Sequence, residues 1–192
     1  EKSNILTKPK ELPKIEDLTE EKPEIDLYEN KAIDIKTKCE FLKIQGIDVP
    51  EKIKTLQSST FAGCRSLKET TLSEGLQLIM SSAFSGTAIE SIHLPDSLKE
   101  IQCDAFKGCE QLKEINLASS HVELIDYGAF YNCVLLEEVI LPNTLLTLGS
   151  NAFSNCSFLK RAYIPASVLE IGSLPFKDCP LLTTIDVDKN NK

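Results

Sequence analysis

The chain has 192 residues, of which 42% are apolar and 26% are charged, a composition typical of a globular protein. Its net charge of −8 argues against nucleic acid as a partner, because phosphate backbones select basic surfaces. No apolar run is long enough to span a bilayer as a helix, which argues against membrane insertion.

Residues 1–30 are rich in proline and charge and show no repeat. They contain Pro9, Pro13 and Pro23, five lysines and nine acidic residues, and they supply −4 of the net charge of −8. Such a composition is typical of a linker or a loosely ordered arm. The alternative is an ordered cap strand through residues 25–28.

Residues 31–50 resemble the second half of a repeat unit. Cys39, Leu42 and Ile47 fit its apolar positions, but Lys36 stands where a phenylalanine is expected and Gln45 where an isoleucine is expected. We predict an atypical capping repeat, because a solenoid needs its exposed core end covered.

A repeat of about 23 residues fills residues 51–192, in about six units. Its anchor is a phenylalanine column with gaps of 23, 22, 24, 23 and 23 residues: Phe61, Phe84, Phe106, Phe130, Phe153 and Phe176. Isoleucine or leucine stands five residues before each Phe, at Leu56, Ile79, Ile101, Ile125, Leu148 and Ile171. Six columns in step over six units are very unlikely to arise by chance.

The second half of each unit carries a cysteine, a leucine and an apolar pair. The cysteine follows the Phe by three residues, at Cys64, Cys109, Cys133, Cys156 and Cys179, with Thr87 in the second unit. The pairs are Thr70–Leu72, Ile92–Leu94, Ile115–Leu117, Val139–Leu141, Ala162–Ile164 and Ile185–Val187. Pro95, Pro142 or Pro165 follows the pair in three units, and we expect it to end a strand there.

These patterns predict a solenoid. One unit cannot bury its own apolar side, but stacked units bury it against one another. The alternation in Ile115-Asn116-Leu117 is typical of a short strand, so we expect one parallel strand per repeat. The segment around each Ala-Phe pair should form an irregular or short helical return on the opposite side.

The repeat resembles the BspA-like, or Treponema-type, leucine-rich repeat. Residues 142–159 match that pattern almost throughout, and the resemblance extends from about residue 39 to the end. It implies a leucine-rich-repeat solenoid in a surface-exposed or secreted protein that binds other proteins, for example in adhesion. Because residues 187–192 resemble the start of a further unit, we expect the natural chain to continue or a cap to be missing.

Six of the seven cysteines share one column, which includes Cys39. We predict buried free thiols there. The alternative is a set of disulfides, since neighbouring strands bring Cα atoms to about 4.8 Å, within bridging range. Parallel side chains in such a ladder make the bridging geometry doubtful. Cys103 lies off the column and is the best candidate for an exposed, reactive thiol.

No motif for catalysis or metal binding is present. The chain lacks CxxC, GxGxxG, P-loop and GxSxG patterns, and its two histidines are His93 and His121. His121 and Glu123 could contact a metal, but two ligands are a weak signal, and ordinary surface residues are the simpler interpretation. We expect no enzyme activity and no cofactor.

The exposed strand face is the best candidate for a binding site. Side chains alternate between the two faces of a strand, so the residue between the two members of each apolar pair should point outward. These residues are Thr71, His93, Asn116, Ile140, Tyr163 and Asp186. Two residues earlier stand Glu69, Ser91, Glu114, Glu138, Arg161 and Thr184. Ile140 and Tyr163 could form an apolar–aromatic hot spot; alternatively, they are only good strand formers on a solvated sheet.

We therefore predict a protein-binding or adhesion module at the cell surface or in the secreted fraction, with a host or matrix protein as partner. The alternative is an intracellular, cytoplasmic scaffold or structural protein of a protist built from the same repeats, because reduced cysteines suit a cytosol as well as a surface.

Overall fold

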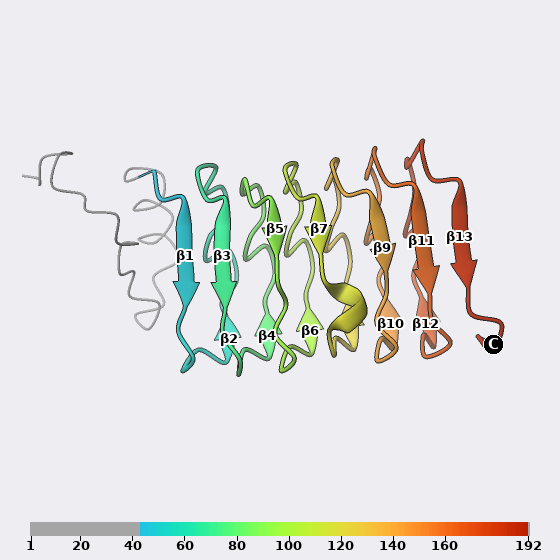
Figure 1. Ribbon diagram of the computed structural model, residues 1–192, viewed down its shortest axis with the longest axis horizontal. Coiled ribbons are helices and arrows are strands. Elements are labelled where there is room, and N and C mark those ends of the chain that lie inside the picture. Colours follow the sequence, from blue (N-terminus) through green and yellow to red (C-terminus); the bar gives the residue numbers. More distant parts are fainter. Residues whose placement is uncertain (1–42, 192) are drawn as a thin grey trace, which may run out of the picture.

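Each repeat contributes one strand to each of two layers, and the repeats stack into a parallel β-solenoid (Figure 1). The structure, a computed structural model, describes residues 43–191. The expectations for residues 1–30, and for the part of the capping repeat before residue 43, lie outside the described residues. Within residues 43–191, no helix is long and apolar enough to cross a membrane.

The front layer holds the strands that the apolar pairs predict. They are β1 (Gly46–Val49), β3 (Glu69–Leu72), β5 (Ser91–Ile92), β7 (Glu114–Ile115), β9 (Glu138–Ile140), β11 (Arg161–Ile164) and β13 (Thr184–Val187). All pairings between them are parallel. The predicted solenoid with one front strand per repeat is confirmed.

The back layer is more regular than the sequence suggested. The column five residues before each Phe forms two-residue strands: β2 (Thr55–Leu56), β4 (Leu78–Ile79), β6 (Glu100–Ile101), β8 (Leu124–Ile125), β10 (Thr147–Leu148) and β12 (Glu170–Ile171). They make one unbroken six-stranded parallel sheet. Identical backbone shapes in successive repeats align each N–H with the carbonyl of its neighbour, so a short segment pairs without a strong strand signal.

The phenylalanine column forms the centre of the core. Neighbouring rings stack with centroids 5.0–5.7 Å apart, and the interplanar angle between Phe106 and Phe130 is only 1°. The first five rings are fully buried, whereas Phe176 in the last repeat is half-buried. The rings lie within the separation at which offset stacking is favourable.

Residues with a left-handed backbone conformation stand two positions before and two positions after each Phe. The residue two positions after the Phe has a φ of 55–76°, and Gly, Asn or Asp fills every such position: Gly63, Gly86, Gly108, Asn132, Asn155 and Asp178. These residue types tolerate a positive φ best, which explains the choice. The residue two positions before the Phe also has positive φ, and there Leu174 at 57° is the bulkiest occupant.

The cysteine column is a ladder of free thiols. From Cys109 to Cys179, each Sγ of the column donates to a Phe carbonyl of the preceding repeat, as Cys133 does to Phe106 at 3.3 Å and Cys179 does to Phe153 at 3.2 Å. Thr87 takes the cysteine position in the second repeat, and its Oγ1 lies 3.3 Å from Cys109 Sγ. The predicted burial is found for Cys64, Cys109, Cys133 and Cys156, whereas Cys179 is half-buried and Cys39 lies outside the described residues.

The register of β1 corrects the expected alignment of the first repeat. Ile47 pairs with Thr70 and Val49 pairs with Leu72, and both Ile47 and Val49 are buried. The expected alignment placed Gln45 and Ile47 in these columns. Gln45 instead lies before the strand, where its backbone carbonyl accepts hydrogen bonds from Lys68 and Glu69. The first repeat is therefore shifted by two residues from the expected alignment, and Gln45 does not occupy a core position.

The last described repeat exposes residues of the core columns. Ile171, Ile185 and Val187 are 49%, 47% and 55% exposed, whereas their equivalents in the middle repeats are buried except for Ile115, which is half-buried. The apolar interior of the solenoid is therefore open at this end of the described chain.

Candidate functional site

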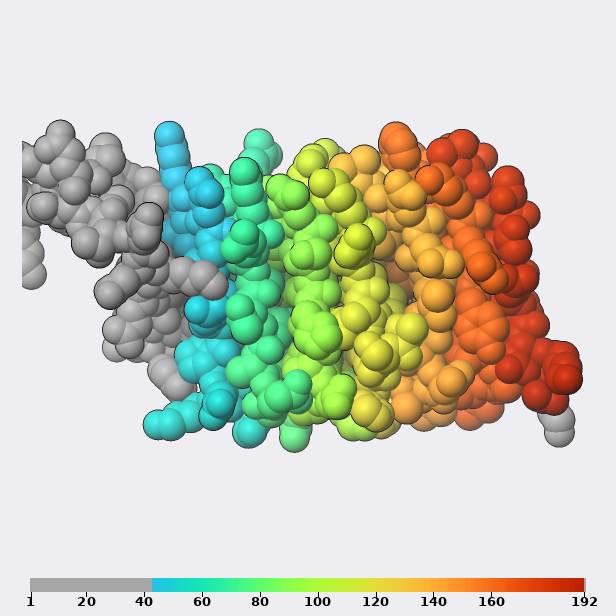
Figure 2. All heavy atoms as spheres, in the orientation of Figure 1, coloured from blue at the N-terminus to red at the C-terminus, as the bar shows by residue number. Residues whose placement is uncertain are grey.

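The front strands place the predicted binding residues on one outward face, which Figure 2 shows in the same view as Figure 1. Most are exposed, namely Glu69, Thr71, His93, Glu114, Glu138, Ile140 and Arg161. Asn116, Tyr163 and Asp186 are half-buried. Alternation along each strand sends the neighbouring apolar residues inward.

Arg161 forms ion pairs with both neighbouring strands in the C-terminal part of this face. Its guanidinium donates to Asp186 at 3.0 and 3.1 Å and lies 3.9 Å from Glu138. The strand register places Tyr163 between Ile140 and Asp186. The expected adjacency of Ile140 and Tyr163 is therefore present, and the charges beside them are paired with one another.

Tyr163 is also engaged within the protein. Its hydroxyl donates to Asp188 at 3.1 Å, and this hydrogen bond to a carboxylate raises the pKa of Tyr163. The backbone N–H of Asn190 and the Tyr163 hydroxyl lower the pKa of Asp188. The ring of Tyr163 thus remains available for contact, while its hydroxyl already has a partner.

Asn116 has a structural role in addition to its place on the face. Its Oδ1 accepts from the Leu94 backbone N–H at 2.6 Å, and its Nδ2 donates to the Leu94 carbonyl at 3.2 Å. It stands immediately before the 3-10 helix η2 (Leu117–Ser119), which is the only helix in residues 43–191. The Asn116 side chain therefore links its own repeat to the preceding one by hydrogen bonds just after β7 ends.

The front layer is divided into three sheets, unlike the back layer, whose strands form one sheet. The sheets are β1–β3, β5–β7 and β9–β11–β13. The breaks coincide with the two repeats of unusual length. From Glu69 to Ser91 is 22 positions and from Glu114 to Glu138 is 24, whereas every other pair of consecutive front strands is 23 apart.

The longer repeat carries its extra residue between β7 and β8. From Glu114 to Leu124 is ten positions, against nine from Glu138 to Thr147. Ala118 stands here in place of the proline that follows the apolar pair in three other repeats, and η2 accommodates the insertion. Figure 1 shows η2 between β7 and β9, where the front strands are visibly farther apart than elsewhere.

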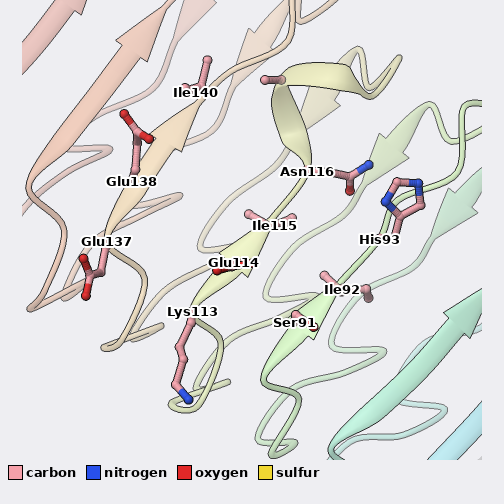
Figure 3. A pocket seen from close by; sticks show the side chains of 11 residues that line it. Ser91, Ile92, His93, Lys113, Glu114, Ile115, Asn116, Glu137, Glu138 and Ile140 are labelled. Atoms are coloured by element: carbon pink, nitrogen blue, oxygen red, sulfur yellow. The ribbon is translucent and has the colours of Figure 1, made fainter.

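A groove of about 860 Å³ lies at this break. Its lining comes from three strands and the residues next to them, most of which Figure 3 labels. They are Ser91 and Ile92 of β5 with His93, Glu114 and Ile115 of β7 with Lys113 and Asn116, Ala118 of η2, and Glu138 and Ile140 of β9 with Glu137. Sequence reasoning missed the groove, although the 24-residue gap between Phe106 and Phe130 and the missing proline were its signal.

Cys103, expected to be an exposed and reactive thiol, is less exposed than the sequence suggested. The thiol is half-buried and donates to an Asp126 carboxylate oxygen at 3.0 Å, which raises the pKa of Cys103 and disfavours the thiolate. Burial raises the pKa of Cys109 to about 11. Contact with Cys156 instead lowers the pKa of Cys179, against the opposing effect of its partial burial.

His121 faces an acidic partner and does not gather metal ligands. Its Nδ1 lies 3.8 Å from Asp96. In residues 43–191, no three His, Cys, Asp or Glu side chains are grouped so that they could hold a metal ion.

The repeats match a known family. The family model of the BspA type leucine rich repeat region matches residues 31–131 and 77–192, in six copies. The chain belongs to this family. No curated protein matches it. BspA-type repeat proteins are generally not enzymes.

Two solved structures are similar to this chain in fold. The leucine-rich-repeat protein TpLRR of T. pallidum is 28% identical with a TM-score of 0.67, over 75% of this chain and 70% of that one. The pneumococcal vaccine antigen PcpA is 29% identical with a TM-score of 0.53, over 77% of this chain and 31% of PcpA.

Proposed function

We propose that this BspA-type chain is a surface-exposed or secreted protein-binding module, and that its front strand face docks a host or matrix protein. The observation that carries the proposal is the groove between β7 and β9, which opens on the same face as exposed Ile140 and the charged row around Arg161. An apolar centre with a polar, charged surround is the usual composition of a protein–protein interface.

The contact residues follow from this placement. Ile140, 41% exposed, and the ring of Tyr163 supply apolar area, while Glu69, Glu114 and Glu138 supply negative charge along the face. Binding energy in such interfaces concentrates in a few apolar or aromatic anchors surrounded by polar contacts. That PcpA is a vaccine antigen favours a surface location for this chain.

The test compares two matched substitutions in the same protein. Ile140→Asp places a charge on the front face, whereas Leu146→Asp does so at a site of nearly equal exposure, 43%, outside the groove. Each variant is immobilised and exposed to a panel of purified extracellular-matrix and serum proteins. We expect Ile140→Asp and Tyr163→Ser to lose a partner that the parent and Leu146→Asp retain. Equal binding by all four would refute the face as the site.

The alternative is an intracellular scaffold of a protist. The six cysteines of residues 43–191 are free thiols, and such thiols persist most readily in a reducing compartment. Fractionation of cells that express the full-length protein separates the two: recovery in the cytosol with no surface signal would favour the scaffold.

A further inference from the structure

The groove lies between two strand edges that are not paired with each other. β7 pairs only with β5, and β9 pairs only with β11. Each of the two strands therefore presents one edge without a ladder partner toward the groove. Unpaired strand edges readily accept an added extended segment, because backbone hydrogen bonds are strong and independent of sequence.

The floor and one wall of the groove are apolar. Ile115 is only half-buried, although its equivalents Ile92 and Val139 in neighbouring repeats are 4% and 1% exposed. Ala118 is exposed beside it, and Ile140 forms part of the opposite side. Aliphatic surface that other repeats bury is here accessible from the front.

The rim of the groove is acidic. Three carboxylates, those of Glu114, Glu137 and Glu138, line it together with one ammonium group, that of Lys113. Glu137 is already paired with Lys160 at 2.7 Å, and Lys113 lies 3.5 Å from Glu90. Glu114 has no ion pair or hydrogen bond from its side chain within residues 43–191, so its charge is open to a ligand.

We propose that the groove binds an extended segment of the partner protein in which basic and aliphatic side chains alternate; this inference rests on the proposed function. Alternation along an added strand sends one set of side chains inward and the other outward. The aliphatic set meets Ile115 on the floor, and the basic set lies beside Glu114 and Glu138 at the rim. The same negative rim repels phosphate backbones, in keeping with the net charge of −8.

The probe is a short fluorescein-labelled peptide with the core Arg-Ile-Arg-Ile, and the readout is fluorescence anisotropy with the whole chain. Two comparison peptides replace either each Arg by Glu or each Ile by Ser. We expect saturable binding of the first peptide only, weakened by added salt because the rim charges are exposed. Equal binding of all three peptides, or of none, overturns the proposal.

Two groove variants and a matched control locate the binding. Glu114→Gln keeps the shape but removes the charge, and it should weaken binding at least about tenfold, as expected for a lost charged hydrogen bond. Ala118→Trp fills the groove from an exposed position and should abolish binding. Glu74→Gln removes an exposed carboxylate outside the groove and should leave the affinity unchanged.

The two proposals fail differently. If Ile140→Asp removes a matrix partner but the peptide does not bind, the face docks a protein and the assignment of its groove segment is wrong. If the peptide binds and Glu114→Gln has no effect, the rim charge does not select the ligand, which also overturns the proposal. Loss of both peptide and partner on Ala118→Trp, with an unchanged circular dichroism spectrum, supports it.

Discussion

Replacing Phe130 by alanine tests the core that sets the spacing of the front face. The ring is fully buried between Phe106 and Phe153, with centroids 5.1 and 5.0 Å away and nearly parallel planes. Truncating a buried Phe to Ala costs roughly 3–5 kcal/mol through lost burial and the cavity left behind. Within that loss, each of the two stacked pairs contributes about 0.5–1.5 kcal/mol beyond its area.

Urea unfolding followed by circular dichroism measures the loss as a shift in midpoint, provided the slope is unchanged. Phe158→Ala is the matched control, because that ring is 46% exposed and its removal should cost about 0.5 kcal/mol or less. Phe130→Leu should fall between the two, since it keeps aliphatic volume and loses the stacking. A loss below about 1 kcal/mol for Phe130→Ala would refute the reasoning, since it would place the ring among ordinary surface residues.

Three further predictions concern single side chains. Leu174→Asn should raise stability by about 1 kcal/mol in urea unfolding, because Leu174 is 59% exposed and held at a φ of 57° that asparagine tolerates better; an unchanged or lower midpoint would contradict this. Iodoacetamide labelling mapped by mass spectrometry should modify Cys179 faster than Cys103, since the pKa of Cys179 is lowered and that of Cys103 is raised; the reverse order would be inconsistent with the hydrogen bonds described. Tyrosine titration by ultraviolet absorbance should show Tyr163 ionising above its ordinary pKa, and Asp188→Asn should bring it back down. Because the folded pKa is raised, this contact stabilises the protein below the ordinary tyrosine pKa and is lost as the pH rises through the raised value.

The sequence alone determined the repeat, its period and its core columns. Phenylalanine every 22 to 24 residues, with apolar residues at fixed offsets, is a local pattern that stacking converts directly into buried ladders, and five of the six rings are fully buried as that pattern requires. Alternation likewise determined which residues face outward, as Ile140 and Glu114 do.

Only the tertiary structure decided the features that depend on contacts between repeats: the back strands, the groove and the environment of Cys103. The back strands are two residues each, too short for a periodic signal, and they exist because six equivalent backbones align. The groove depends on where one extra residue is accommodated: η2 contains it after β7, and β7 and β9 do not pair with each other. Whether Cys103 is reactive depends on Asp126, which lies 23 residues away in sequence and one repeat away in space. Contacts between residues of different repeats form only once the repeats are stacked. The sequence pattern therefore identifies the residues of the front face, but the shape of that face depends on how the repeats pack.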